Sequence, residues 1–278
     1  MSVRIEAITK IQERVAKNGS IVLPEGGGKK ARKKLIATES AYNNARRKVI
    51  EHEYATGYRL WVGGGSRYDV MSPESDFTRK LTQAIVKELG IDVITGAGPG
   101  IMGAASQGLI DAKQQAKGND KEITARSLGI GLKVPWEEDR TTFDYYRDHP
   151  ELLTRVQELI DLSHAAYVGP GAIGTNFELW ALIQLKQMGH IEPEYALVVH
   201  PSWKQSIEDF RKQWFEERKK RGERPTMNEE DLNITFSDNI PEITAIITES
   251  WRAWNESVGQ HIRRRSRIFP WQKKKINQ

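Results

Sequence analysis

The chain of 278 residues contains no cysteine. Disulfides, zinc–thiolate sites and cysteine nucleophiles are therefore excluded. Long apolar runs are also missing, because no stretch approaches the roughly 20 apolar residues that cross a bilayer. The start, MSVRIEAITKIQERVAKNG, has none of the apolar core that marks a signal peptide. We therefore expect a cytoplasmic protein with no membrane span.

A large charge excess is absent as well. Lysine and arginine total 42 against 37 acidic residues, which gives a net charge of +5 and a pI near 9.2. The basic residues gather in two clusters: Lys29, Lys30, Arg32, Lys33 and Lys34, and Arg263, Arg264, Arg265, Arg267, Lys273, Lys274 and Lys275. Such patches can bind nucleic acid, although a basic run is more often a solvated surface. Nucleic-acid binding through the basic tail is thus an alternative that the sequence does not favour.

From Arg59 onward, short apolar runs alternate with amphipathic stretches. The predicted strands are RLWVGGG, DVITGAG, LGIGLKVP, AAYVGPG and YALVVHP. Helices are expected near residues 74–89, 101–113, 150–162, 176–188, 202–219 and 240–257, and WEEDRTTFDYYRD is expected to be a loop. This alternation predicts a doubly wound, Rossmann-like α/β fold, with a mostly parallel sheet covered by helices on both faces.

The same alternation suggests how the chain is divided. Residues 1–55 read as a polar, helical N-terminal extension, and residues 56–250 as a nucleotide-binding α/β domain. Residues 251–278 complete a C-terminal helix and add the basic tail.

Two nearly identical glycine-rich phrases stand out. GPGIMG at 98–103 and GPGAIG at 169–174 both have the spacing G-x-G-x-x-G, and each follows a predicted strand and opens a helix. A third glycine turn, GGGS at 63–66, ends the first strand in the same way. Helix N-termini carry free N–H groups and a partial positive charge. If the three turns fall on one edge of one sheet, they form a site for a phosphorylated ligand.

Two common glycine motifs fit less well. A dinucleotide-binding Rossmann unit has an acidic residue at the end of its second strand, whereas the strand after GPGIMG ends in LKVP. The stretch GGGKK suggests a P-loop, but the pattern G-x-x-x-x-G-K-[ST] is absent and no apolar strand precedes it.

The second glycine turn resembles a known family. PGAIGTNFE at 170–178 is similar to the P-G-G-x-G-T-x-x-E signature of the LOG ("lonely guy") family, and TGAGPGIMGAASQG at 95–108 is similar to that family's G-G-G-x-x-G-x-M-G turn. The family also has an essential arginine 23 residues before the signature glutamate, which is the separation of Arg155 from Glu178. The resemblance runs from about Arg59 to residue 250. Ala172 replaces the second glycine of the signature, and Val156 stands where the family commonly has lysine.

The resemblance implies a phosphoribohydrolase of the SLOG superfamily, which cleaves a nucleoside 5′-monophosphate such as AMP to free base and ribose 5-phosphate. It also implies a homodimer or higher homo-oligomer, and no cofactor. The catalytic residues would be Glu178 and Arg155. The residues binding phosphate and nucleotide would be Gly171, Ala172, Ile173, Gly174, Thr175, Gly96, Gly98, Gly100, Met102, Gly103, Ser66 and Arg67.

The chemistry of these residue types agrees with that reaction. Breaking an N-glycosidic bond builds positive charge on the ribose, which a carboxylate such as Glu178 stabilises. Arg155 would either fix Glu178 or meet the phosphate. The six histidines show no metal-ligand spacing, so we predict no metal site.

Each residue also has a purely structural interpretation. Thr175 and Glu178 form T-x-x-E, a capping box, and Arg155 follows Glu151 at the spacing of a helix-surface ion pair. The apolar residues of the helix near 176–188 are predicted to be core: Phe177, Trp180, Ala181, Leu185 and Met188. The remaining functional alternative is a nucleotide-binding sensor or carrier that catalyses nothing.

Overall fold

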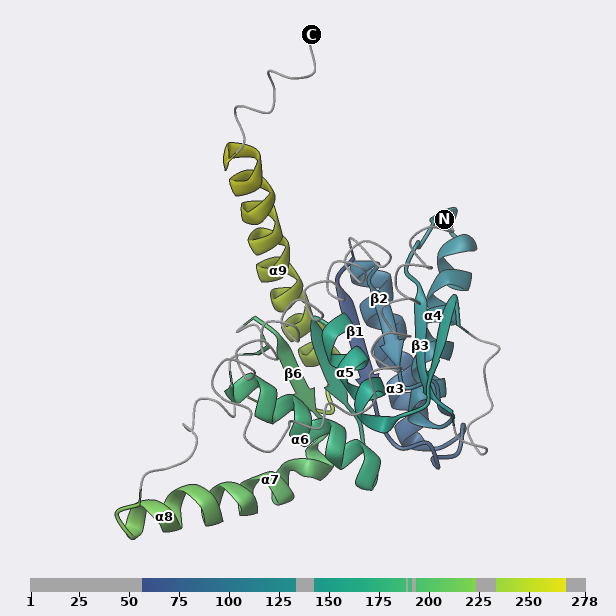
Figure 1. Cartoon of the computed structure of the whole chain (residues 1–278). Helices are drawn as coiled ribbons and strands as arrows, with labels where there is room; N and C mark the ends of the chain where they lie inside the picture. The colour runs from purple at the N-terminus through teal and green to yellow at the C-terminus, as the bar shows by residue number, and fades with distance from the viewer. Residues whose placement is uncertain (1–56, 134–142, 189, 192–193, 224–233, 269–278) are drawn as a thin grey trace, which may run out of the picture. The chain divides into compact units, whose positions relative to one another are not determined.

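The computed structural model describes residues 57–268, apart from residues 134–142, 189, 192–193 and 224–233 (Figure 1). The strands are β1 (Arg59–Gly63), β2 (Asp92–Thr95), β3 (Ser127–Leu132), β4 (Tyr145–His149), β5 (Ala165–Val168), β6 (Ala196–Val199) and β7 (Thr235–Phe236). The helices are α3 (Pro73–Leu89), α4 (Ile101–Lys117), α5 (Leu152–Leu162), α6 (Ile173–Gln187), α7 (Lys204–Arg211), α8 (Glu217–Lys220) and α9 (Ile240–Ile268). A 3₁₀ turn (Pro201–Trp203) precedes α7, and a π-helical turn (Lys212–Glu216) joins α7 to α8.

The strands form one seven-stranded sheet in the order β4-β3-β2-β1-β5-β6-β7, with every pair parallel. The predicted α/β fold is therefore confirmed. The chain leaves β1 toward β2 on one side and later returns to β5 on the other. This reversal creates a switch point between β1 and β5, the place where open α/β sheets bind ligands.

The sequence did not predict the two edge strands. The segment expected to be a loop contains β4, whose residues YYRDH are mostly polar and only half buried. An edge strand pairs with a neighbour along one edge only and is less buried than a central strand, so it needs no continuous apolar run. Strand β7 has only two residues, which is too short to leave a periodic signal.

The two faces of the sheet are covered by different helices (Figure 1). Leu60 and Val62 of β1 pack in a core with residues of α3, α4 and α9. Trp61 points to the opposite face, where α5 and α6 lie, and a Cβ on Gly63 would lie 3.6 Å from its indole nitrogen and 3.6 Å from Oε2 of Glu178. Because both faces are buried, β1 is a continuous apolar run rather than an alternating one.

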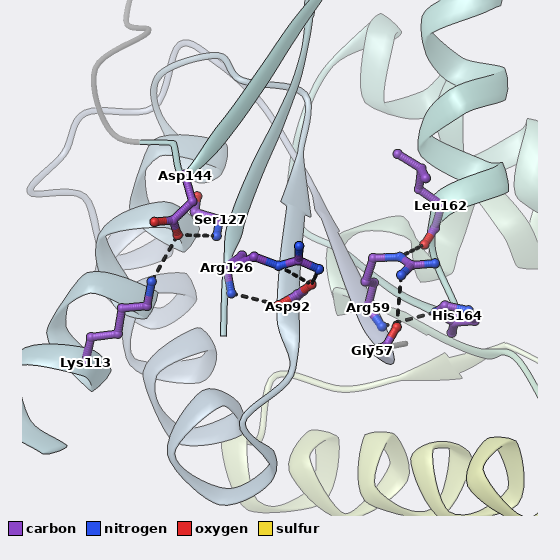
Figure 2. A network of polar contacts seen from close by, with 9 residues as sticks. All are labelled: Gly57, Arg59, Asp92, Lys113, Arg126, Ser127, Asp144, Leu162 and His164. Carbon is purple, nitrogen blue, oxygen red and sulfur yellow. Dashed lines mark hydrogen bonds and ion pairs between the residues drawn. The ribbon is translucent and has the colours of Figure 1, made fainter. Parts of the chain in front are cut away.

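At the amino ends of the strands, polar contacts link residues at or next to the starts of β1, β2, β3, β4 and β5 (Figure 2). The buried Arg59 donates to the carbonyl oxygens of Leu162 and Gly57, and its backbone N–H donates to Nδ1 of His164. Asp92 accepts from the backbone and the guanidinium of Arg126, with its Oδ2 2.7 Å from Nη2. Next to them, Asp144 accepts from the backbone of Ser127 and the amine of Lys113.

Helix α6 buries a different stripe from the one predicted. Leu179, Leu182 and Ile183 are buried, whereas Phe177 is 40% exposed and Met188 is 57% exposed. Trp180 is half buried and packs against Phe210 of α7 in a tilted arrangement, with ring centroids 4.6 Å apart. The apolar residues of α6 occupy two neighbouring stripes at helical spacing, and periodicity alone does not say which one faces the sheet.

Several predictions fall partly or wholly outside the described residues. The N-terminal extension and the basic cluster at 29–34 belong to residues that the structure does not describe, as do the side chains of the basic tail. Helix α9 continues to Ile268, beyond the predicted end near 257. Among the described helices, none combines the length and apolar character required to cross a bilayer.

Candidate functional site

The three glycine turns meet at the carboxyl ends of β2, β1 and β5. The backbone N–H of Gly65 donates to the carbonyl of Pro170 at 2.9 Å, and the carbonyl of Gly65 accepts from Ile101 at 3.1 Å. Gly169 donates to the carbonyl of Gly63 at 2.8 Å. The first turn thus lies between the other two and is bonded to both, so the arrangement expected from the sequence is confirmed.

At the glycines of these turns, neighbouring parts of the chain approach closely. Gly100 has a φ of +66°, and a Cβ there would lie 2.5 Å from the carbonyl oxygen of Gly65. A Cβ on Gly96 would overlap the guanidinium of Arg155, and one on Gly98 would lie 2.6 Å from Cε of Met102. These three glycines are buried, together with Met102. Their first effect is therefore to bring the turns and Arg155 together.

The second glycine-rich segment, GPGAIG at 169–174, is more exposed than GPGIMG at 98–103. Ala172, Ile173 and Gly174 are exposed, and Ile173 is 86% exposed. A Cβ on Gly174 would have no atom within 4 Å, whereas one on Gly171 would overlap Thr175. Gly171 is therefore needed for packing, and Gly174 lies at the surface.

Helix α6 begins without a side-chain cap. It starts at Ile173 after Ala172, three residues earlier than predicted, and the first intrahelical bond runs from Asn176 to the carbonyl of Ala172. Thr175 therefore lies inside the first turn and is buried, so the predicted capping box does not form. The N–H groups of Ile173, Gly174 and Thr175 have no partner within the helix, as in any first turn. Helix α4 also begins without a side-chain cap, after Gly100.

Arg155 and Glu178 form a buried ion pair at the same edge of the sheet. Arg155 is 6% exposed and Glu178 is 7% exposed, and Nη1 of the arginine lies 2.9 Å from Oε1 of the glutamate. The other two guanidinium nitrogens of Arg155 also donate, Nη2 to the carbonyl of Gly96 and Nε to the carbonyl of Ile130, both at 3.0 Å. The arginine therefore connects α5 with α6 and with the ends of β2 and β3.

These contacts distinguish between the interpretations of Arg155. Its guanidinium points into the protein and holds Glu178, so the predicted surface pair with Glu151 does not account for it. A buried charge is tolerated when it is paired and hydrogen-bonded. Of the two functional roles expected for Arg155, the contacts favour holding Glu178 over meeting the phosphate.

The remaining predicted residues lie around this pair. Ser66 is half buried against the second turn, since a Cβ on Gly98 would lie 3.5 Å from its own Cβ. Arg67 is exposed next to it. Gly103 is half buried in the first turn of α4. The described residues bring together no group of three or more histidine, aspartate or glutamate side chains that could hold a metal ion.

Two residues of this edge were not among the predicted site residues, although one of them, Gly64, lies within the glycine turn GGGS named from the sequence. Trp203 donates its indole N–H to the carbonyl of Gly169 at 2.9 Å and so fixes the turn after β5. Gly64 has to be glycine because a Cβ there would collide with Ile101. The glycine run at 63–65 was a visible signal for the second residue, whereas nothing in the sequence marks Trp203 as a neighbour of that turn.

A scan against models of protein families finds no match, and a search among curated proteins finds none either. Among solved structures, the chain is similar to a structural-genomics target, TM1055, with 19% identity over 51% of this chain and 72% of that chain (TM-score 0.37). It is also similar to a molybdenum cofactor carrier protein from Chlamydomonas reinhardtii, with 11% identity over 70% and 98% (TM-score 0.45). A third is the molybdenum cofactor binding protein of the phototrophic bacterium Rippkaea orientalis, with 16% identity over 52% and 77% (TM-score 0.38). Likeness at this level carries no argument about function.

Proposed function

We propose that the protein hydrolyses the N-glycosidic bond of a nucleoside 5′-monophosphate, releasing the free base and ribose 5-phosphate. The observation that carries this proposal is the Arg155–Glu178 pair, which holds a carboxylate at the edge where three glycine turns meet. The LOG-like spacing of the two residues in the sequence supports the same reaction.

In this proposal, the phosphate binds at the start of α6. The N–H groups of Ile173, Gly174 and Thr175 lie in a first turn without a capping side chain. The exposed Ala172–Gly174 segment leaves space for a ligand to approach, and the helix dipole favours an anion there. Ala172 has a φ of −117°, so an alanine at the second glycine of the signature is not strained.

Glu178 then acts on the ribose. As the bond to the base breaks, the anomeric carbon and ring oxygen become positively charged, and a nearby carboxylate stabilises that charge more than it stabilises the neutral substrate. Arg155 keeps the carboxylate in one orientation before the substrate arrives, which avoids reorganisation during the reaction. The water that attacks the anomeric carbon would be oriented by the same carboxylate.

The direct test is to incubate the purified protein with a panel of nucleotides and to separate any released base by chromatography. We expect base from at least one 5′-monophosphate, and at least a tenfold preference for AMP over adenosine, about 1.4 kcal/mol. Equal turnover of the two would contradict phosphate binding. Binding of AMP without release of base from any nucleotide would favour the sensor or carrier alternative.

We also propose that the protein is a homodimer that uses α6. The exposed side chains of Ile173 and Phe177 lie on this helix and that of Met188 directly follows it, and burying apolar side chains against a second copy is favourable. Sedimentation analysis should give a dimer for the wild type and a monomer for Phe177→Glu. A monomeric wild type would contradict this assignment.

A further inference from the structure

The turn after β5 is held from both of the strands that β5 pairs with, β1 and β6. On the β1 side, the backbone N–H of Gly169 donates to the carbonyl of Gly63 at 2.8 Å. On the β6 side, the carbonyl of Gly169 accepts from the indole N–H of Trp203 at 2.9 Å. Each neighbour therefore contributes one hydrogen bond to the same glycine, and the bond from the β6 side comes from a side chain.

The backbone pairing of this turn ends just before α6 begins. Proline has no N–H, and the carbonyl of Pro170 accepts from the backbone N–H of Gly65 at 2.9 Å. All backbone hydrogen-bonding groups of Gly169 and Pro170 thus have partners. The first turn of α6, in contrast, has no side-chain cap over the N–H groups of residues 173–175. A fixed backbone therefore leads directly into a set of donors that the helix itself does not use.

The indole of Trp203 is itself placed by a short 3₁₀ turn, Pro201–Trp203, that follows β6. The backbone N–H of His200 donates to the carbonyl of Val168 at 2.9 Å, which ties the start of this turn to β5. Nδ1 of His200 accepts from the backbone N–H of Ser202 at 3.2 Å and caps the turn. The side chain of Trp203 is buried, with 9% of the residue exposed. The indole donor is therefore fixed by its own backbone and by burial.

We propose that Trp203 is a positioning residue for the phosphate of the nucleotide. By holding the carbonyl of Gly169, its indole fixes the path of the turn that leads into α6, and with it the N–H groups of the first helical turn. Donors that are already in place bind an anion without the cost of ordering a loop. In this role Trp203 does not touch the substrate, because it acts through the backbone of Gly169. The inference rests on the proposed function, since it concerns the phosphate site of that reaction.

Two pairs of variants test this role. Trp203→Phe removes the N–H and keeps an aromatic ring. Its matched control is Trp61→Phe, which makes the same change at a tryptophan that is 1% exposed and whose indole nitrogen has no hydrogen-bond partner within the described residues. The second pair acts on the turn that places the indole. His200→Ala removes the cap, whereas His200→Asn keeps a side-chain acceptor of a type that caps well.

Calorimetric titration with AMP and with adenosine measures the contribution of the phosphate as a ratio of two Kd values. For Trp203→Phe, we expect the Kd for AMP to rise about tenfold and the Kd for adenosine to stay within about twofold, because the lost hydrogen bond holds only the phosphate turn. His200→Ala should raise the Kd for AMP about threefold. His200→Asn and Trp61→Phe should both match the wild type.

A purely structural role for Trp203 gives a different pattern. Thermal melts would then show a loss of stability, while the ratio of the two Kd values would stay as in the wild type, and this result overturns the inference. An equal loss of the ratio in Trp61→Phe overturns it too, as does a wild type that binds AMP no better than adenosine. If Trp203→Phe does not fold, the His200 pair decides in its place, and equal Kd values for AMP in that pair count against the inference.

These titrations do not depend on turnover. If no base is released from any nucleotide, the proposed hydrolysis fails, while the ratio of Kd values still decides whether Trp203 positions the phosphate.

Discussion

Both ends of the parallel sheet contain a buried arginine, but the two arginines are used differently. At the amino end, Arg59 donates to the carbonyls of Leu162 and Gly57, while the nearby carboxylate of Asp92 is bound by Arg126 (Figure 2). At the carboxyl end, Arg155 itself holds the carboxylate of Glu178. The amino-end network joins the starts of the strands. The carboxyl-end pair instead places a carboxylate on a helix beside open glycine turns.

The carboxylates at the two ends are held by different partners. Asp92 accepts from the backbone of Arg126 as well as from its guanidinium, so both of its oxygens are used to hold β2 against β3. Oε1 of Glu178 accepts from Nη1 of Arg155, and its Oε2 lies 3.6 Å from the position that a Cβ on Gly63 would take. Asp92 therefore joins two neighbouring strands, whereas Glu178 joins helix α6 to Arg155 of α5.

The largest expected effect comes from removing Arg155. Arg155→Met leaves Glu178 as a buried charge without its partner, and we expect the free energy of unfolding to fall by about 3–5 kcal/mol. Arg59→Met should cost less, because Asp92 keeps Arg126. Urea unfolding of both variants makes the comparison, and equal losses would contradict the distinction between the two ends. The double variant Arg155→Met/Glu178→Leu should recover most of the stability and remain inactive.

A change of charge alone at the carboxyl end should affect rate more than binding. We expect Glu178→Gln to lower kcat about a hundredfold or more and to bind AMP within a few-fold of wild type, because the amide keeps the size but not the negative charge. Calorimetry and base release give the two quantities, after a thermal melt has shown that the variant is folded. Wild-type turnover in the folded variant would mean that Glu178 only packs.

The amino end should respond to acid instead. Burial, and then the charge of Arg59, lowers the pKa of His164 from 6.5 to about 3. A pKa lowered by folding means that the unfolded chain binds the proton more tightly. Stability from this group is therefore complete above about pH 6.5 and is lost as the pH falls toward 3. The loss approaches about 1.4 kcal/mol per pH unit.

His164→Phe tests this acid dependence, because a phenyl ring can still stack between Tyr58 and Trp254. Urea unfolding between pH 7 and pH 4 should show a shallower slope for this variant than for the wild type. Substitution of the exposed His190 by glutamine should leave the slope unchanged. An unaltered slope in His164→Phe would place the acid sensitivity elsewhere.

Part of this arrangement is visible in the sequence. The central strands could be predicted because both of their faces are buried, and the three glycine turns because each ends such a strand. The resemblance to the LOG signature drew attention to Glu178 and Arg155, but the sequence left open whether Arg155 holds Glu178 or meets a phosphate, because the direction of the guanidinium depends on the carbonyls of Gly96 and Ile130. The buried stripe of α6 and the edge strand β4 were missed, since both depend on which neighbour covers them.

The smallest effect at the carboxyl end is expected from Gly96→Ala, which narrows the space for the guanidinium of Arg155. A Cβ on Gly96 would overlap the Nη2 atom of Arg155 and lie 2.9 Å from Sδ of Met102. Both atoms are at the flexible ends of side chains, so Gly96→Ala should fold with a loss below about 2 kcal/mol. The guanidinium, however, has to leave the carbonyl of Gly96, and the carboxylate of Glu178 then loses its fixed orientation. We expect kcat to fall about tenfold with little change in AMP affinity.

The matched control is Gly57→Ala beside the amino-end network, where a Cβ would lie 3.6 Å from Asp92 in ordinary contact. That variant should keep both stability and turnover. If Gly96→Ala retains full kcat, the orientation of Arg155 does not govern the carboxylate, and the two ends of the sheet differ in structure but not in chemistry.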